Sequence, residues 1–220
     1  MEYEPDEVFD EVARTARVLG NGSRLRMLQL LAQGERSVLD LAGAAVLNVT
    51  TASAHLQALR AVGLVASRRN GNQVIYRLAG PDVAAVVTAL VKVAEAHHAV
   101  VGQALARDEE GVEPMSREAL LDAVASGRVL VIDVRPADEY ATGHLPGAIS
   151  LPLDELRRRL DEVPADQEVV AYCRGRLCEM SHEAVALLRS RGIDARATED
   201  GVLEWRADGV DLVPALGDQR

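Results

Sequence analysis

The sequence has very little cysteine. Of its 220 residues only two are cysteines, Cys173 and Cys178, which lie five positions apart. Two cysteines so close together cannot supply the disulfide framework of a small secreted domain, and they fit a reducing compartment. A chemical role for these thiols is therefore a better interpretation than a structural one.

The sequence also lacks long hydrophobic runs and is not rich in glycine or proline. No uninterrupted apolar run reaches the roughly 18 residues that a membrane span needs, and the first residues are acidic rather than basic, unlike a signal peptide. With 17 Gly, 8 Pro, 48% hydrophobic and 26% charged residues, the composition excludes collagen-like, low-complexity and disordered chains. We expect a cytoplasmic globular protein with no membrane partner.

The charge is distributed unevenly along the chain. The formal net charge of −10 argues against nucleic-acid binding, but residues 12–80 hold nine Arg and two acids, whereas residues 108–220 hold 13 basic and 24 acidic residues. The length favours two small domains. The first of them has the charge to meet DNA, and the second would repel it.

The first half reads as short helices followed by a hairpin. Apolar spacing predicts a helix over 6–19 and a second helix capped by Ser23. A third helix is predicted from Ser37, with Leu39, Leu41 and Ala42 facing the core. A fourth is predicted over 49–62, with Asn48 as its N-cap and Gly63 at its end. Asn70-Gly71 between two β-prone runs predicts a tight hairpin turn with positive φ at both residues. A long helix over 82–106 follows, with a stripe of apolar residues at Val83, Val87, Leu90, Ala94, Val101 and Leu105.

The second half alternates apolar runs with helical segments, which indicates a parallel sheet covered on both faces. Helices are predicted over 116–126, 154–162 and 179–191 and around Trp205, and strands over 129–132, near Ile149, and over 169–172 and 194–198. In such sheets the working site lies beyond the carboxyl ends of the strands. Asp133 and Cys173 each follow a strand at that edge.

Helices followed by a basic hairpin form a winged helix-turn-helix, in which one helix enters the major groove and the hairpin reaches the backbone or minor groove. On that helix, base contacts are expected from Thr50, Thr51, Ser53, His55 and Gln57. Phosphate contacts are expected from Arg60, Arg68 and Arg69. Thr50 has an alternative reading as a helix cap, and His55 has one as a packing residue.

Residues 18–28, 47–56 and 59–65, with Arg77 after Tyr76, resemble the ArsR/SmtB transcriptional regulators over about residues 6–106. The resemblance implies double-stranded operator DNA as a partner and a homodimer built on the N-terminal helix and the helix over 82–106. It also implies a repressor that is released by a metal or redox signal. The alternative to dimerisation through the long helix is that its apolar stripe packs against its own domain.

The metal sites of that family are not matched here. Residues 37–44 lack the cysteine pair of the soft-metal sensors, and Ala84 stands where the zinc sensors have a histidine two positions after Asp82. His97 and His98 point about 100° apart on a helix, so both cannot face one ion from the same subunit. Members that sense persulfides use two cysteines in this domain, which here has none. We predict no metal and no other cofactor.

Cys173 follows a strand and precedes a loop with Arg174, Gly175 and Arg176 that ends at Cys178 and feeds a helix. Loop amides, the helix N-terminus and the arginines are expected to favour a thiolate at Cys173 that holds an anion or a persulfide. The alternative is a buried structural cysteine at the end of a strand.

Five separated motifs in this half resemble the rhodanese domain, over about residues 114–216. They are 133–135, 139–140, 143–148, the strand into Cys173, and Gly201 with Trp205 and Gly209. The resemblance implies that Cys173 is the nucleophile that carries sulfane sulfur and that Asp133, Arg135 and His144 brace the domain. Glu179 stands where related phosphatases and arsenate reductases have an arginine, which disfavours phosphate and arsenate. Cys178 replaces the usual Ser, Thr or Arg, which weakens the case for thiosulfate turnover and suggests a resolving thiol.

The expected fold class is thus a mainly α winged helix-turn-helix with a β-hairpin wing, followed by an α/β rhodanese-like domain with a central parallel sheet. The boundaries are 1–106 for the first domain, 107–113 for a linker, and 114–220 for the second. The leading hypothesis is a regulator that senses a small sulfur donor or oxidant through Cys173. The alternatives are a thiosulfate or persulfide sulfurtransferase with an autoregulatory DNA-binding domain, and a non-catalytic rhodanese interaction module.

Overall fold

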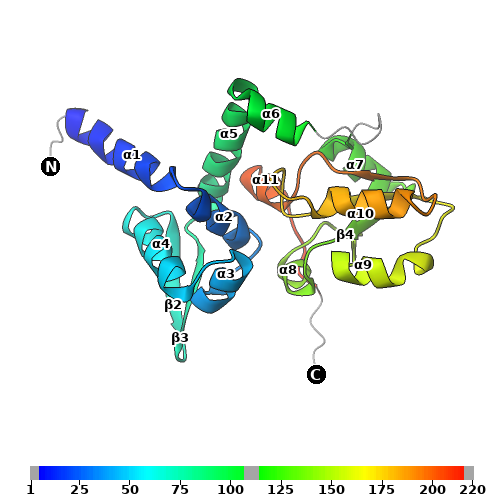
Figure 1. Ribbon diagram of the computed structural model, residues 1–220, viewed down its shortest axis with the longest axis horizontal. Helices are drawn as coiled ribbons and strands as arrows, with labels where there is room; N and C mark the ends of the chain where they lie inside the picture. The colour runs from blue at the N-terminus through cyan, green and yellow to red at the C-terminus, as the bar shows by residue number, and fades with distance from the viewer. Residues whose placement is uncertain (1–4, 107–113, 216–220) are drawn as a thin grey trace. The chain divides into compact units, whose positions relative to one another are not determined.

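The structure is a computed structural model that describes residues 5–106 and 114–215 (Figure 1). It divides into two compact units, Met1–Val87 and Thr88–Arg220, and the division falls within helix α5 (Pro81–His97). The linker predicted at 107–113 lies outside the described residues.

The first unit is a set of short helices with a small antiparallel sheet of order β1-β3-β2. The short strand β1, which pairs with β3, was not expected from the sequence. Its elements before α5 are α1 (Pro5–Leu19), α2 (Gly22–Leu31), β1 (Arg36–Ser37), α3 (Val38–Ala44), α4 (Val49–Ala61), β2 (Val65–Asn70) and β3 (Gln73–Leu78). The predicted winged helix-turn-helix is confirmed.

Polar caps set the starts of these helices. The Asn48 side chain accepts the Thr51 amide at 2.8 Å and begins α4, as the sequence predicts. The predicted cap at Ser23 is wrong, because Asn21 accepts the Arg24 amide and begins α2 two residues earlier. Leu39 was expected inside but is 64% exposed, since α3 turns only its following apolar residues, including Leu41, into the core.

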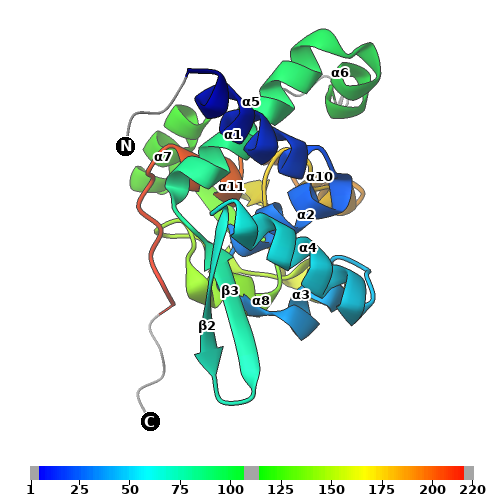
Figure 2. The ribbon, with the colours of Figure 1, turned by 90° about the vertical axis from the view of Figure 1, so that its left-hand side faces the viewer.

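The wing is a hairpin whose turn is shifted by one residue from the prediction. Asn70 pairs with Gln73, so the two turn residues are Gly71 and Asn72. Only Gly71 has a positive φ, of 58°, which fits a turn with glycine at its first central position. In Figure 2 the hairpin β2–β3 extends away from the helices of this unit.

The long helix predicted over 82–106 is broken. Helix α5 ends at His97, His98 is extended with φ −117° and ψ 105°, and α6 (Ala99–Leu105) continues at a bend of 108°. Two adjacent histidines, which are weak helix formers, stand at the break. Val101 and Leu105 therefore do not extend the stripe of α5. In the described ranges no single helix is long and apolar enough to span a membrane, although α5 and α6 taken together pass that test by length and composition.

The second unit contains the predicted parallel sheet, in the order β5-β4-β6-β7. Helix α8 is not among the helices predicted from the sequence. The elements after α6 are α7 (Arg117–Ala125), β4 (Val129–Asp133), α8 (Ala137–Thr142), β5 (Ile149–Ser150), α9 (Leu153–Arg159), a 3-10 turn (Leu160–Glu162), β6 (Glu168–Tyr172), α10 (Met180–Arg189), β7 (Ala195–Ala197) and α11 (Val202–Ala207).

Alternate residues of the central strands feed two separate cores. Val169 and Ala171 of β6 face the core that α9 and α10 cover, while Val170 and Tyr172 face the core that α7 and α11 cover. This period of two explains why the strands read as continuous apolar runs, because both faces are buried.

The chain order of the strands creates a crevice at one edge of the sheet. From β4 the chain moves to β5 on one side and returns to β6 on the other, so the carboxyl ends of β4 and β6 flank a topological switch point. Ligands of open parallel sheets bind at such points. Asp133 ends β4 and Cys173 follows β6, so both lie at this edge.

Candidate functional site

The outer face of α4 carries the polar residues that the sequence singled out for base contacts. Ala52, Leu56 and Leu59 are fully buried, so the opposite face of the helix is turned to solvent. Thr50 and Gln57 are exposed, and the Gln57 amide donates to the hydroxyl of Ser53, one turn earlier in the helix, at 3.4 Å. Thr51 and His55 are half-buried at one edge of this face, and exposed Arg60 lies at the other.

The two wing arginines differ in their surroundings. The Arg68 guanidinium donates to the Glu35 carboxylate from both Nε and Nη2, at 2.9 and 2.7 Å. Arg69 is exposed, one position further along β2. Because Arg68 already has a carboxylate partner, Arg69 presents the less compensated charge at the wing.

In the second unit, Cys173 is buried at the end of β6 with its thiol among acceptor oxygens. Its Sγ lies 3.6 Å from the carbonyl oxygen of Cys178, 4.0 Å from that of Gly175 and 3.3 Å from Oγ of Ser181 in the first turn of α10. Burial is the main reason that the pKa of the Cys173 thiol is raised, and its hydrogen bond to Cys178 raises this pKa further. The expectation of a thiolate at Cys173 is therefore not met in this arrangement.

The pKa of Cys178 shifts in the opposite direction. The hydrogen bond from Cys173, the backbone amides of Met180 and Arg174 and the Arg174 guanidinium outweigh burial and lower the pKa of Cys178 to about 6. The two thiols interact, and this interaction raises the pKa of Cys173 while it lowers the pKa of Cys178. A thiol next to a thiolate is the arrangement from which sulfur exchange proceeds.

Close backbone packing fixes the cysteine loop. Gly201, at the start of α11, lies so near that a Cβ on it would stand 2.4 Å from the amide nitrogen of Gly175 and 2.6 Å from the carbonyl oxygen of Cys173. Gly175 has a φ of 146°, which side chains rarely adopt, and a Cβ there would meet Glu204 at 2.7 Å. The buried Glu204 carboxylate accepts the amides of Gly201 and Arg176, at 3.0 and 3.4 Å.

Two buried ion pairs brace the edge of the sheet. Asp133 and Arg135 are both fully buried and bonded at 2.5 Å, and Arg135 also donates to the carbonyl oxygen of Gly143 at 2.8 Å. Arg174 makes a bidentate pair with the buried Glu139 carboxylate at 2.7–3.1 Å. These contacts fix the positions of the end of β4, helix α8 and the cysteine loop relative to one another.

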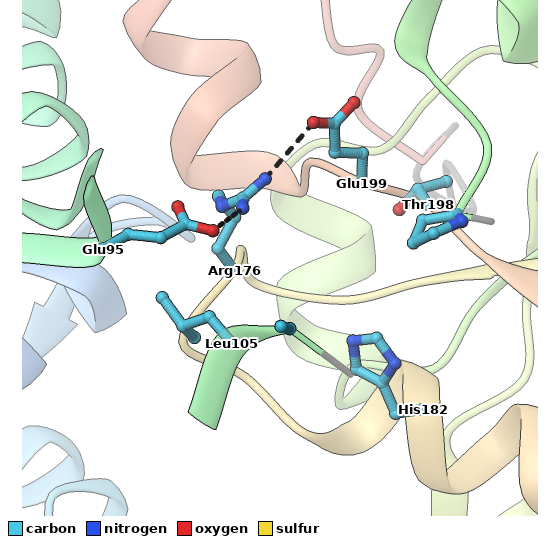
Figure 3. Close-up of a pocket in the computed structure, with 8 residues that line it drawn as sticks. Glu95, Leu105, Arg176, His182, Thr198 and Glu199 are labelled. Carbon is cyan, nitrogen blue, oxygen red and sulfur yellow. Dashed lines mark hydrogen bonds and ion pairs between the residues drawn. The ribbon is translucent and has the colours of Figure 1, made fainter. Parts of the chain in front are cut away.

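Two hollows that share four lining residues lie beside the loop. The outer cavity, of about 380 Å³, is lined by Glu95, Leu105, Ala106, Pro114, Arg176, His182, Thr198 and Glu199 (Figure 3). The inner one, of about 10 Å³, reaches Cys173 and shares Arg176, His182, Thr198 and Glu199 with the outer one. Arg176 lies between two carboxylates, 2.5 Å from Glu95 and 3.4 Å from Glu199.

The structure brings together Cys173, Cys178 and the loop residues between them, as the sequence order requires, and adds residues that the sequence reasoning missed. Ser181 and Glu204 contact the loop, Glu139 holds Arg174, and Glu95 holds Arg176. A hydroxyl in the first turn of the helix that follows the loop was a usable signal for Ser181. The carboxylates are 28 to 81 positions away from their partners and left no local signal. Among the described residues no group of three or more His, Cys, Asp or Glu side chains is placed to hold a metal ion.

The comparisons with known proteins agree with both units. The model of the bacterial regulatory protein, arsR family, matches residues 21–67, and the rhodanese-like domain model matches residues 116–208. A sulfurtransferase of Allochromatium vinosum is 33% identical over 90 residues, which cover 40% of this chain and 82% of that protein. The solution structure of a homodimeric winged helix-turn-helix DNA-binding domain from Mycobacterium bovis is 48% identical, with a TM-score of 0.40, and covers 44% of this chain and 94% of that one.

One relative matches along nearly the whole chain. An HTH-type transcriptional regulator of Mycobacterium tuberculosis is 46% identical over 205 residues, which are 92% of this chain and 90% of that protein. The match to this relative therefore includes both domains of the chain in a single alignment. The chain belongs to the ArsR-type HTH transcriptional regulators that carry a C-terminal rhodanese-like domain.

Proposed function

We propose that this DNA-binding regulator senses sulfane sulfur or an oxidant through Cys173 and Cys178, and that modification of the pair weakens its hold on operator DNA. The observation that carries the proposal is the placement of two free, buried cysteines at the switch point of the sheet, with Sγ of Cys173 3.6 Å from the carbonyl oxygen of Cys178. The DNA-binding unit contains neither of the two cysteines of the chain, so a thiol signal has to enter through the second unit.

The proposed chemistry uses both thiols. As Cys173 attacks the terminal sulfur of a persulfide donor, its proton passes to the Cys178 thiolate, a new S–S bond forms on Cys173, and the donor leaves as a thiolate. Cys178, once deprotonated again, attacks Sγ of Cys173, expels hydrosulfide and closes a disulfide. The donor sulfur supplies the oxidising equivalents, so no other oxidant is required.

The test is to treat the full chain with inorganic polysulfide and titrate it onto operator DNA selected from a random library by the protein itself. Coupling between sites of 1–3 kcal/mol predicts an affinity loss of about 5- to 150-fold. Unchanged affinity after the cysteine pair has been fully converted to the Cys173 persulfide or the Cys173–Cys178 disulfide contradicts the proposal. Repeated turnover with a thiol acceptor and no change in affinity would favour a sulfurtransferase instead.

We propose that α4 and the wing form the DNA interface, with Thr50, Thr51, Ser53, His55 and Gln57 toward the bases and Arg60, Arg68 and Arg69 toward phosphates. The exposure of most of this set on one face of α4 and along β2 supports it. A regulator that acts on bacterial operator DNA works in the cytoplasm, which is our proposed location.

Arg69→Ala is expected to weaken binding to all DNA sequences alike and to lower the slope of log affinity against log salt by about one. The reason is the loss of one phosphate contact. Arg68→Ala is the matched comparison, and we expect it to change the slope less, because Arg68 is already neutralised by Glu35. Equal slopes for wild type and Arg69→Ala would exclude Arg69 from the interface.

We propose a homodimer built on α1 and α5. Helix α6, which bends away after His97, does not continue the apolar stripe of α5 and is not part of this proposed interface. Apolar side chains on α1 are left in solvent, with Val8 50%, Phe9 73% and Val12 63% exposed. On α5, Val86 and Leu90 are 45% and 41% exposed, on a face different from the buried one. Exposed apolar patches of this kind mark interfaces.

Phe9→Glu is expected to raise the dimer dissociation constant by about tenfold or more, because it puts a charge into a desolvated contact. Sedimentation equilibrium of the full chain measures the change. Arg17→Gln, which alters the net charge by the same amount on an exposed residue of the same helix, is the control. A wild-type protein that sediments as a monomer at tens of micromolar would contradict the proposal.

A further inference from the structure

The hollows beside the cysteine loop are acidic. Glu95 and Glu199 of the outer cavity hold Arg176 between them (Figure 3). Asp200 lines the inner hollow. Burial and the neighbouring Glu199 raise the pKa of the Asp200 carboxyl, so a further negative charge is poorly accommodated there. A dianion such as thiosulfate meets net repulsion in this setting.

Arg176 nevertheless keeps one donor for a ligand. Its side chain is 18% exposed, and its Nε is buried without a hydrogen-bond partner among the described residues. A buried donor without an acceptor is costly. An acceptor oxygen on a bound molecule would satisfy it, and a carboxylate is a natural partner of a guanidinium.

The sizes of the two hollows separate the reacting end of a ligand from its body. The inner hollow of about 10 Å³ leads to Cys173 and is only as large as a single water-sized atom requires. The outer cavity of about 380 Å³ has room for a small molecule, and Leu105, Ala106 and Pro114 give part of its wall an apolar surface. A terminal sulfur atom fits the first, and the rest of the donor fits the second.

We propose that the outer cavity binds a low-molecular-weight hydropersulfide with a zwitterionic body. Its ammonium group faces Glu95 and Glu199, its carboxylate accepts from Arg176, and its terminal sulfur points to Cys173. This inference rests on the proposed function and specifies the donor class of the same site. The transfer step is the one given above: the terminal sulfur forms a bond to Cys173, the S–S bond of the donor breaks, and the donor departs as a thiolate.

The test compares three donors on the full chain. Cysteine hydropersulfide carries both charges, the hydropersulfide of 3-mercaptopropionate carries only the carboxylate, and thiosulfate is a dianion. The rate at which the reduced dithiol form disappears is followed by mass spectrometry, counting both the Cys173 product with one added sulfur and the Cys173–Cys178 disulfide, and the readout is the ratio between donors, because intrinsic reactivities differ. Glu95→Gln is expected to lower the preference for cysteine hydropersulfide over the mercaptopropionate donor by about fivefold or more, and Arg176→Gln is expected to slow both carboxylate donors by about tenfold.

Glu118→Gln and Arg158→Gln are the matched controls, since both residues are exposed and lie outside the cavity. We expect these two variants to keep the wild-type ratios. Ratios that are the same in wild type, Glu95→Gln and Arg176→Gln would overturn the inference, as would thiosulfate reacting faster than cysteine hydropersulfide in the wild type.

A binding measurement separates this inference from the proposed function. S-methylcysteine has the same charges but no sulfur to transfer, and we expect it to bind the Cys173→Ser protein saturably in calorimetry and to lose binding in the Cys173→Ser, Arg176→Gln double variant. If it binds and the donor ratios shift while operator affinity stays constant, the cavity assignment stands and the sensing proposal fails. If polysulfide weakens operator binding but S-methylcysteine does not bind, the sensing proposal stands and the cavity assignment fails.

Discussion

The Cys173→Ser protein is expected to bind its operator equally well before and after polysulfide treatment, while the wild type loses about 5- to 150-fold in affinity. The substitution removes the sulfur that reaches the inner hollow but keeps a hydrogen-bonding group beside Ser181. The fold and the DNA interface should therefore be preserved. An electrophoretic titration with and without polysulfide gives the result directly.

Cys178→Ser sharpens this prediction, because it separates the two steps of the proposed reaction. This variant should gain one sulfur on Cys173 and keep it, since no second thiol can close the disulfide. It should also gain that sulfur more slowly, because the Cys178 thiolate that accepts the Cys173 proton is absent. A Cys173→Ser protein that still responds to polysulfide would contradict the proposed role of Cys173.

Arg135→Met is expected to destabilise the second unit by about 3–5 kcal/mol, the cost of leaving one partner of a buried ion pair without the other. Asp133 and Arg135 are both 0% exposed, so water cannot replace the lost guanidinium. Two further contacts disappear with it, the hydrogen bond to the Gly143 carbonyl and the position of the guanidinium 5.7 Å from the centre of the Tyr172 ring.

Trp205 makes this prediction easy to measure. It is the one tryptophan of the chain, it is fully buried in the second unit, and its ring lies edge-on to Tyr172 at 4.8 Å. Its fluorescence in a urea titration therefore reports unfolding of this unit. Arg157→Met is the control, because the ion pairs of Arg157 with Asp154 and Glu183 are both exposed and each contributes at most about 1 kcal/mol.

The double variant Asp133→Leu, Arg135→Met tests the cause of the loss. If the uncompensated Asp133 carboxylate is responsible, removing it should recover part of the stability lost in Arg135→Met. A loss of less than about 1 kcal/mol in the single variant would mean that the pair does not brace the sheet.

The parts of the structure that follow from local chemistry were predictable from the sequence. The cap at Asn48, the alternation of strands and helices in the second half, and the place of Cys173 between a strand and a helix depend on neighbours within a few positions. The bracing role of Asp133 and Arg135 was implied by the family resemblance, and the structure shows it as a contact between residues two positions apart.

The parts that depend on distant contacts were not predictable. Glu139 meets Arg174 across 35 positions, and Glu95 meets Arg176 across 81. The helix break at His98 contains no proline or glycine that would have predicted it. The upward shift in the pKa of Cys173 was missed for the same reason, because the arginines and the following helix are visible in the sequence, whereas the burial that is its largest cause is not.

The charge on Glu204, which accepts hydrogen bonds from the cysteine loop, depends on pH near neutrality. Burial raises the pKa of this carboxyl from its ordinary 4.5 to about 7. Between these two values the folded chain binds more protons than the unfolded chain, so the free energy of unfolding of the second unit falls as pH rises through this window, by at most about 3 kcal/mol. Below pH 4.5 Glu204 costs nothing, and above pH 7 its cost is complete. A shift of half a pH unit around neutrality thus changes the charge beneath the loop amides, and with it the readiness of the loop to hold a negatively charged sulfur.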